Sequence, residues 1–278
     1  MAVCAATAGA ATASAAPSDK AGIEYLALGD SVVFGYRPSA ITPPADYLNP
    51  NNFVGYPEYL DRLPGVQATN AACPGETTGS FIDVTAQNNG CETNVDGTPG
   101  YRAYFPLHVN YSGSQLDFAV QYLRAHPDTR VVSIGIGAND FFVCQQVNAD
   151  GCTGADLTAT LGQISANLTR IYSALREQAH YQGTLVDVSY YSLDYGDPQQ
   201  VAVVQALNAA AAGPTKQFGG IIADGFGAFQ LASKPAGGDS CQAGLLLPLP
   251  TGGCDEHPSA RGQLLLAGAV ALAVAGQH

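Results

Sequence analysis

The chain has 278 residues, of which 46% are hydrophobic and 12% are charged, and 23 acidic against 11 basic residues give it a net charge of −12. This hydrophobic content is enough for a packed core and excludes a chain that is disordered throughout. The acidic balance argues against nucleic acid or an anionic membrane surface as the main partner, because both attract basic patches.

The first sixteen residues have the composition of an export signal. They carry no charged side chain, consist mainly of small residues, and end in a small-x-small tripeptide at 13–15. That pattern precedes the cleavage site of secretory signal peptides. A disordered alanine-rich tail is the alternative, since the segment has no Lys or Arg and only a weak apolar stretch. We expect residues 1–16 to be a signal peptide or its remnant and residues 17–278 to form one domain.

The rest of the chain alternates β-rich runs with amphipathic stretches. Compact apolar runs predict strands at Glu24–Leu28, Val66–Asn70, Val131–Ile136, Thr184–Val188 and Gly220–Ala223. Helical spacing of apolar residues predicts helices at Tyr56–Leu63, Gln115–Ala125, Asp156–Ala179, Gln199–Phe218 and Ser259–Ala275. This alternation is typical of an α/β fold with a parallel sheet of about five strands and helices on both faces. The most apolar segment, Leu264–Ala275, is too short to span a bilayer, so no stable membrane insertion is expected.

Seven cysteines are present, and Cys4 lies in the expected signal peptide. The other six fall into three local couples, and the most economical pairing joins the members of each couple. The predicted disulfides are Cys73–Cys91, Cys144–Cys152 and Cys241–Cys254. A zinc site is the competing interpretation, but Cys-x-x-Cys and comparable Cys/His spacings are absent from the sequence. Three disulfides require an oxidising compartment and predict a secreted, extracellular protein.

A serine directly follows the first predicted strand, in the sequence Gly29-Asp30-Ser31. Reactive groups of parallel α/β folds gather at the carboxyl ends of the strands, so Ser31 is a candidate nucleophile. The alternative is that Asp30 or Ser31 only caps the next helix. The G-x-S-x-G motif of α/β-hydrolases is absent, which points to a different class of hydrolase.

Two further strand ends carry groups suited to binding an oxyanion. Gly75 follows the second strand, where the backbone can approach a ligand and present its N–H. Asn139 follows the third strand, and its side-chain amide is a neutral donor, although a simple turn residue is the alternative. The surrounding glycines half-resemble a dinucleotide fingerprint, but Asp140 stands at the last glycine position, which disfavours nucleotide binding.

His257 stands out among the five histidines. An acidic pair precedes it, and the predicted Cys241–Cys254 disulfide would anchor it. A lone histidine is more often structural than catalytic. At this position, before the last predicted helix, we favour a general base for the serine.

These blocks, Gly29-Asp30-Ser31, Gly75, Gly137 to Asp140 and His257-Pro258, occur in the order found in SGNH (GDSL-type) hydrolases. From Tyr25 onward the chain resembles this superfamily, and its cysteine couples resemble those of secreted actinobacterial esterases and phospholipases. The resemblance implies a flavodoxin-like three-layer α/β/α fold and ester hydrolysis through an acyl-enzyme. Ser31 would be the nucleophile and His257 the general base and then acid. The N–H groups of Ser31 and Gly75 and the amide of Asn139 would form the oxyanion hole. No cofactor or metal is implied.

One position departs from the family pattern. The family usually has Asp three residues before the histidine, but here that position is Cys254, and Asp255 lies two residues before it. Either Asp255 reaches the imidazole through an altered turn, or the backbone carbonyl of Cys254 holds it and leaves a Ser–His dyad. We favour the dyad, because the expected disulfide would hold that carbonyl in place.

The substrate is predicted from the side chains near the expected site. Tyr101, Tyr104, Phe105, Phe141, Phe142 and Leu245–Leu247 are candidates to line an acyl pocket, and packing among the loops is the alternative. We expect a small-molecule or lipid ester with a short-to-medium acyl chain, hydrolysed by a monomer. A carbohydrate O-acetylesterase is the second candidate, and a non-catalytic secreted binding protein is the third.

Overall fold

The computed structural model describes residues 22–277, so the expected signal peptide, Cys4 and His278 lie outside the described residues. Its main sheet has five strands, all parallel to their neighbours, in the order β2-β1-β3-β4-β5. The strands are β1 (Ile23–Gly29), β2 (Val66–Asn70), β3 (Val131–Gly135), β4 (Thr184–Val188) and β5 (Ile221–Ala223). The predicted parallel α/β sheet is confirmed, with every strand within one residue of its expected bounds.

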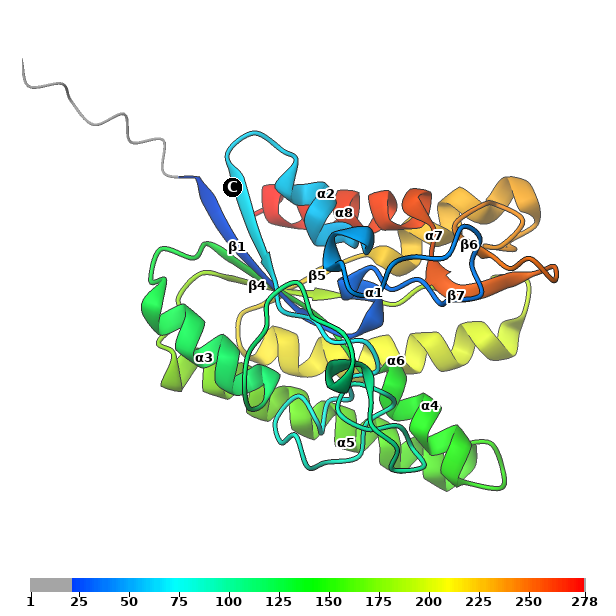
Figure 1. Ribbon diagram of the computed structural model, residues 1–278, viewed down its shortest axis with the longest axis horizontal. Coiled ribbons are helices and arrows are strands. Elements are labelled where there is room, and N and C mark those ends of the chain that lie inside the picture. Colours follow the sequence, from blue (N-terminus) through cyan, green and yellow to red (C-terminus); the bar gives the residue numbers. More distant parts are fainter. Residues whose placement is uncertain (1–21, 278) are drawn as a thin grey trace, which may run out of the picture.

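Helices cover both faces of this sheet, which gives three layers (Figure 1). One face carries α1 (Ser31–Phe34), α2 (Tyr56–Asp61), α7 (Gly225–Ser233) and α8 (Ala260–Ala275). The other carries α3 (Gln115–Ala125), α4 (Ala138–Val147), α5 (Gly154–Ser173) and α6 (Pro198–Gln217). A π-helical turn, Ala174–Gln178, continues α5, and short 3₁₀ turns occupy Pro50–Asn52, Tyr101–Ala103 and Lys234–Ala236.

The two cores follow from the alternation of side chains along the strands. In β1, Tyr25 and Ala27 pack under α1, α2 and α8, whereas Leu26 and Leu28 pack against α3 and α5. All four side chains are buried. Because both faces are covered, the strands read as continuous apolar runs rather than alternating ones, as expected for a parallel sheet.

Two helices and a hairpin were not predicted. The α4 segment spreads its polar residues around the helix, and the α7 segment carries two glycines, so neither shows a clear apolar stripe. The Asp224 side chain caps α7 by accepting from the N–H of Gly227 at 2.8 Å. The hairpin pairs β6 (Leu246–Pro248) with β7 (Cys254–Pro258) in antiparallel fashion. Each of these strands ends in a proline, and because proline is rare inside sheets, the sequence did not indicate a strand at either position.

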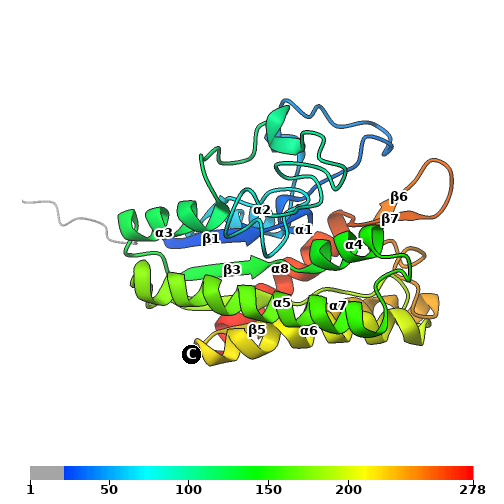
Figure 2. The same cartoon turned by 90° about the horizontal axis from the view of Figure 1, so that it is seen from below.

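All three predicted disulfides are present, with Cα–Cα distances of 5.7 Å for Cys73–Cys91, 5.3 Å for Cys144–Cys152 and 5.7 Å for Cys241–Cys254. Within residues 22–277 no helix combines the length and the apolar character needed to cross a bilayer. Figure 2 shows β1 and β3 pointing toward the end of the molecule where α4 and the β6–β7 hairpin lie. The loops after the parallel strands therefore meet the hairpin at one edge of the sheet.

Candidate active site

A cavity of about 810 Å³ opens where these loops meet the hairpin. Its wall contains the four residues selected from the sequence, Ser31, Gly75, Asn139 and His257. Ser31 and Asn139 lie in the first turns of α1 and α4, which follow β1 and β3, whereas Gly75 lies in the loop after β2 and His257 in strand β7. Parallel strands bring their carboxyl ends to a common edge, which is how Ser31, Gly75 and Asn139 come together. The antiparallel β6–β7 hairpin adds His257, which lies 226 positions after Ser31 in the chain.

Ser31 begins α1 immediately after a tight turn. A Cβ atom on Gly29, whose φ is +140°, would lie 2.1 Å from the carbonyl oxygen of Gly135, so only glycine fits between β1 and β3. The Asp30 side chain caps α1 by accepting from the N–H of Val32 at 2.9 Å. As the first residue of the helix, Ser31 has no intrahelical acceptor for its own N–H, which leaves that donor for a ligand.

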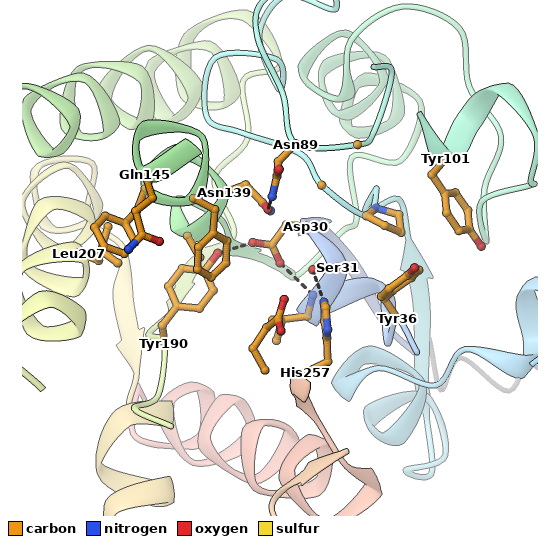
Figure 3. Close-up of a pocket in the computed structure, with 18 of the residues that line it drawn as sticks. Asp30, Ser31, Tyr36, Asn89, Tyr101, Asn139, Gln145, Tyr190, Leu207 and His257 are labelled. Carbon is orange, nitrogen blue, oxygen red and sulfur yellow. Dashed lines mark hydrogen bonds between the residues drawn. The ribbon is translucent and has the colours of Figure 1, made fainter. Parts of the chain in front are cut away.

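His257 contacts Ser31 and Asp255 through its two ring nitrogens. Its Nε2 lies 2.8 Å from the Ser31 Oγ (Figure 3). Its Nδ1 lies 2.5 Å from Oδ1 of Asp255. The same Asp255 oxygen accepts from the backbone N–H of His257 at 3.0 Å. The expectation that the carbonyl of Cys254 orients the ring is therefore wrong.

The reason is the extended backbone of β7. Residues i and i+2 of a strand point to the same side, so the Asp255 and His257 side chains lie side by side and meet. The hydroxyl of Tyr191 donates to the carbonyl of Glu256 at 2.7 Å and fixes the strand between them. Burial alone would raise the pKa of Asp255, but the hydrogen bond from His257 and its charge outweigh burial and hold this pKa below its ordinary value.

Gly75 and Asn139 lie on the other side of Ser31. Gly75 has a φ of +81°, and among residues 22–277 its N–H donates to no acceptor. Asn139 lies in the first turn of α4 and is 5% exposed. Its Nδ2 donates to the carbonyl of Glu76 at 3.0 Å, which leaves one further N–H of that amide. A backbone donor and a side-chain donor therefore border the cavity beside the serine.

Asp30 has a second role that the sequence did not reveal. It is 1% exposed and accepts a short hydrogen bond from the hydroxyl of Tyr190, which also borders the cavity. Burial raises the pKa of Asp30 to about 6, although the bonds from Tyr190 and Val32 favour the ionised form. Tyr190 comes two residues after β4, so the rule that functional groups follow strand ends would have selected it.

The cavity extends to two sides of the Ser31–His257 pair. Figure 3 places Asn139, Gln145, Tyr190 and Leu207 on one side and Tyr36 and Tyr101 on the other. We call the first side the α6 arm; its apolar lining is Phe141, Phe142, Val203, Val204 and Leu207. We call the second side the tyrosine arm; its lining is Tyr36, Tyr47, Tyr101, Tyr104 and Phe105.

Most of the predicted pocket residues are in this wall, but one group is not. Tyr101, Tyr104, Phe105, Phe141 and Phe142 line the cavity. In contrast, Leu245–Leu247 are buried in the core beside β7 and do not line it. The apolar segment 245–247 is needed for packing, because Leu245 and Leu246 contact the side of the core that contains α8.

Two clusters within residues 22–277 bring three potential metal ligands together. The first contains Cys73, Glu76 and Cys91, but its two cysteines are joined in a disulfide and offer no thiolate. The second is 255–257, in which the imidazole of His257 is already hydrogen-bonded to the carboxylate of Asp255 and to the hydroxyl of Ser31. Both clusters are thus explained by the contacts described above.

Comparisons with known proteins agree with this architecture. The model of the GDSL-like lipase/acylhydrolase family matches residues 27–265. No curated protein matches the chain in sequence. A putative GDSL-like lipase from Parabacteroides merdae superposes with a TM-score of 0.55 at 16% identity, covering 92% of this chain and 97% of that one. An acetylxylan esterase from Geobacillus stearothermophilus gives 0.52 at 16% identity, covering 91% and 94%. At such identities the likeness shows a shared fold.

Proposed function

The chain belongs to the GDSL-like lipase/acylhydrolase family and is a carboxylic ester hydrolase, and we propose that it works through an acyl-enzyme formed on Ser31. The observation that carries this proposal is the 2.8 Å contact between the Ser31 Oγ and Nε2 of His257. A serine hydroxyl attacks an ester only when its proton is removed, and a neutral imidazole within hydrogen-bond reach does this.

His257 acts twice in the proposed mechanism. It first takes the proton of Ser31 as the oxygen attacks the ester carbonyl, and then donates that proton to the leaving alcohol. In the second half it takes a proton from the water that attacks the acyl carbonyl, and it returns that proton to the Ser31 oxygen as the bond to the acyl group breaks and the acid leaves. Asp255 supports both steps, because its carboxylate accepts from Nδ1 and stabilises the imidazolium that forms.

Three donors bind the negative oxygen that develops on the ester carbonyl in this proposal. They are the N–H groups of Ser31 and Gly75 and the remaining N–H of the Asn139 side chain. A free first-turn N–H, a glycine at positive φ and a buried, oriented amide support this assignment. Each well-placed donor of this kind is worth about 3–4 kcal/mol in the transition state.

For the substrate we propose a lipid or a short-to-medium acyl ester. The α6 arm supports an acyl chain longer than acetyl, because its aliphatic and aromatic side chains offer an apolar surface beside the serine. The tyrosine arm lies next to the base, where the leaving alcohol must be: the rings of Tyr36 and His257 are 5.1 Å apart. An O-acetylated carbohydrate is the second candidate, since aromatic walls also bind sugar rings and the acetylxylan esterase named above has this fold.

We also propose that the protein is exported and acts as a monomer. Three disulfides support the first point, because such bonds persist in oxidising compartments. Detection of the chain in culture medium with six cysteines blocked to alkylation would test export, and light scattering would test the monomer.

The mechanism is tested by trapping the acyl-enzyme. A p-nitrophenyl ester should release a burst of nitrophenol equal to the enzyme concentration, with the acyl group found on the peptide that contains Ser31. Ser31→Ala should abolish both the burst and steady hydrolysis. Hydrolysis that persists in a folded Ser31→Ala variant would remove Ser31 as the nucleophile.

A further inference from the structure

Asn89 contacts both of the oxyanion donors that lie outside α1. Its backbone N–H donates to the carbonyl of Gly75 at 2.8 Å, and its side-chain Nδ2 donates to Oδ1 of Asn139 at 2.9 Å. In Figure 3 the end of the Asn89 side chain meets that of Asn139. Nothing in the sequence motifs selects this residue, because it lies in a long loop without helical or strand periodicity.

The side-chain contact determines which end of the Asn139 amide faces the ligand. The two ends of an asparagine amide have nearly the same shape, so neighbouring donors and acceptors decide its orientation. Here the amide of Asn89 meets the oxygen of Asn139, and the carbonyl of Glu76 meets its nitrogen. The reversed amide would place a carbonyl oxygen where the negative oxygen of the transition state develops, and would repel it.

Asn89 is itself held in orientation from both ends. Nε2 of Gln146, on α4, donates to Oδ1 of Asn89 at 2.9 Å, so the Asn89 nitrogen is directed toward Asn139. The Cys73–Cys91 disulfide closes the loop that contains both Gly75 and Asn89. Gly75 comes two residues after Cys73, and Asn89 comes two residues before Cys91. A Cβ atom on Gly75 would lie 2.4 Å from the carbonyl oxygen of Asn89, which shows how closely the two segments pack.

We propose that Asn89 is a positioning residue of the oxyanion hole, which orients the Asn139 amide and sets the Gly75 backbone from within the Cys73–Cys91 loop. The proposal rests on the function proposed above, in which Asn139 and Gly75 donate to the ester oxygen. It predicts that changes at Asn89 act on the chemical step rather than on substrate binding, and that they act through Asn139.

The test compares two changes at this position. Asn89→Ala removes the donor, and we expect kcat to fall about tenfold with KM within twofold. Asn89→Asp keeps the size but presents an acceptor to Oδ1 of Asn139, and we expect a loss of about a hundredfold, approaching removal of a whole oxyanion donor. A purely structural role does not predict this order. Equal losses in the two variants, or a rise in KM in place of the fall in kcat, would overturn the proposal.

A matched control and a double mutant separate the explanations. Gln87→Glu adds the same charge to the same loop, but Gln87 is exposed, lies outside the cavity wall and donates to the carbonyl of Asn88 rather than to Asn139, so kcat should stay within twofold. In an Asn139→Ala background, Asn89→Ala should cost less than twofold. Multiplying losses would show that Asn89 does not act through Asn139.

Gln146→Glu provides a variant on an exposed side chain, which should fold even where Asn89→Asp does not. It removes the donor that holds the Asn89 amide, and kcat should fall a few-fold; an unchanged kcat would count against the network. Failure of this proposal is distinct from failure of the proposed function, because Ser31→Ala tests the nucleophile independently of every Asn89 variant.

Discussion

Oδ1 of Asp255 lies 2.5 Å from Nδ1 of His257, and a single residue separates the two in the chain. The family's usual spacing is one residue longer, and the extended backbone of β7 makes the shorter spacing sufficient. Asp255, His257 and Ser31 therefore form a continuous chain of hydrogen bonds from acid to base to nucleophile.

Asp255→Asn should lower kcat strongly. The amide cannot hold the imidazolium as a carboxylate does, and it stabilises the wrong tautomer; the comparable change in a serine protease costs about 10⁴-fold. Asp128→Asn is the matched control, because Asp128 is exposed and lies outside the cavity wall, and it should leave kcat within twofold. Steady-state kinetics on p-nitrophenyl butyrate would measure both. Nearly full activity in Asp255→Asn would show that Ser31 and His257 work as a dyad that does not need Asp255.

Val203→Trp should shorten the acyl chains that the enzyme accepts. Val203 lines the α6 arm, so the larger ring would fill space that an octanoyl chain needs and an acetyl group does not. We expect the rate with p-nitrophenyl octanoate to fall at least about tenfold and the rate with the acetate to change little, since each buried CH₂ is worth about 0.8 kcal/mol. Ala202→Trp, on the exposed side of α6, is the control. Equal losses with both esters would place the acyl chain elsewhere.

Asp187 should make the protein less stable as pH rises. It is 3% exposed, and its Oδ2 has no hydrogen-bond partner among residues 22–277. Burial raises the pKa of Asp187 from 3.8 to about 7. Between those values the folded state holds a proton that the unfolded chain has released, so the free energy of unfolding falls through that window and levels off above it.

Asp187→Asn removes this titration. At pH 8 we expect the variant to be more stable than the parent by about 2–4 kcal/mol, with little difference at pH 4. Urea unfolding at both pH values measures this, and Asp128→Asn, at an exposed carboxylate, is the control. If Asp187→Asn does not raise the free energy of unfolding at pH 8, ionised Asp187 does not destabilise the folded protein and the prediction is wrong.

Removing the Cys73–Cys91 disulfide should affect stability and activity together. The Cys73→Ala/Cys91→Ala double variant opens a loop of 18 residues and should lose about 3 kcal/mol, while Cys144→Ala/Cys152→Ala opens one of 8 residues and should lose about 2.5 kcal/mol. The first loop carries Gly75 and Asn89 themselves, whereas the second carries only Gln146, so the first variant should lose more kcat than the second at temperatures where both are folded. Equal kcat values in the two variants would contradict this link.

The sequence by itself determined the parallel sheet, most of its covering helices and the disulfide pairs. Apolar runs and helical spacing are local signals, and the cysteine couples are close in the chain. Ser31, Gly75, Asn139 and His257 were found for a related reason: each lies in a short motif at or near the end of an element, and parallel topology brings most strand ends to one edge.

Only the tertiary structure decided what surrounds these residues. The pairing of Asp255 with His257 depends on β7, a strand that forms because a hairpin partner and Tyr191 hold it. Asn89 and Tyr190 act through contacts with residues 50 and 160 positions away in the chain. Such contacts leave no periodic trace in a sequence, because packing and hydrogen bonding between distant segments create them.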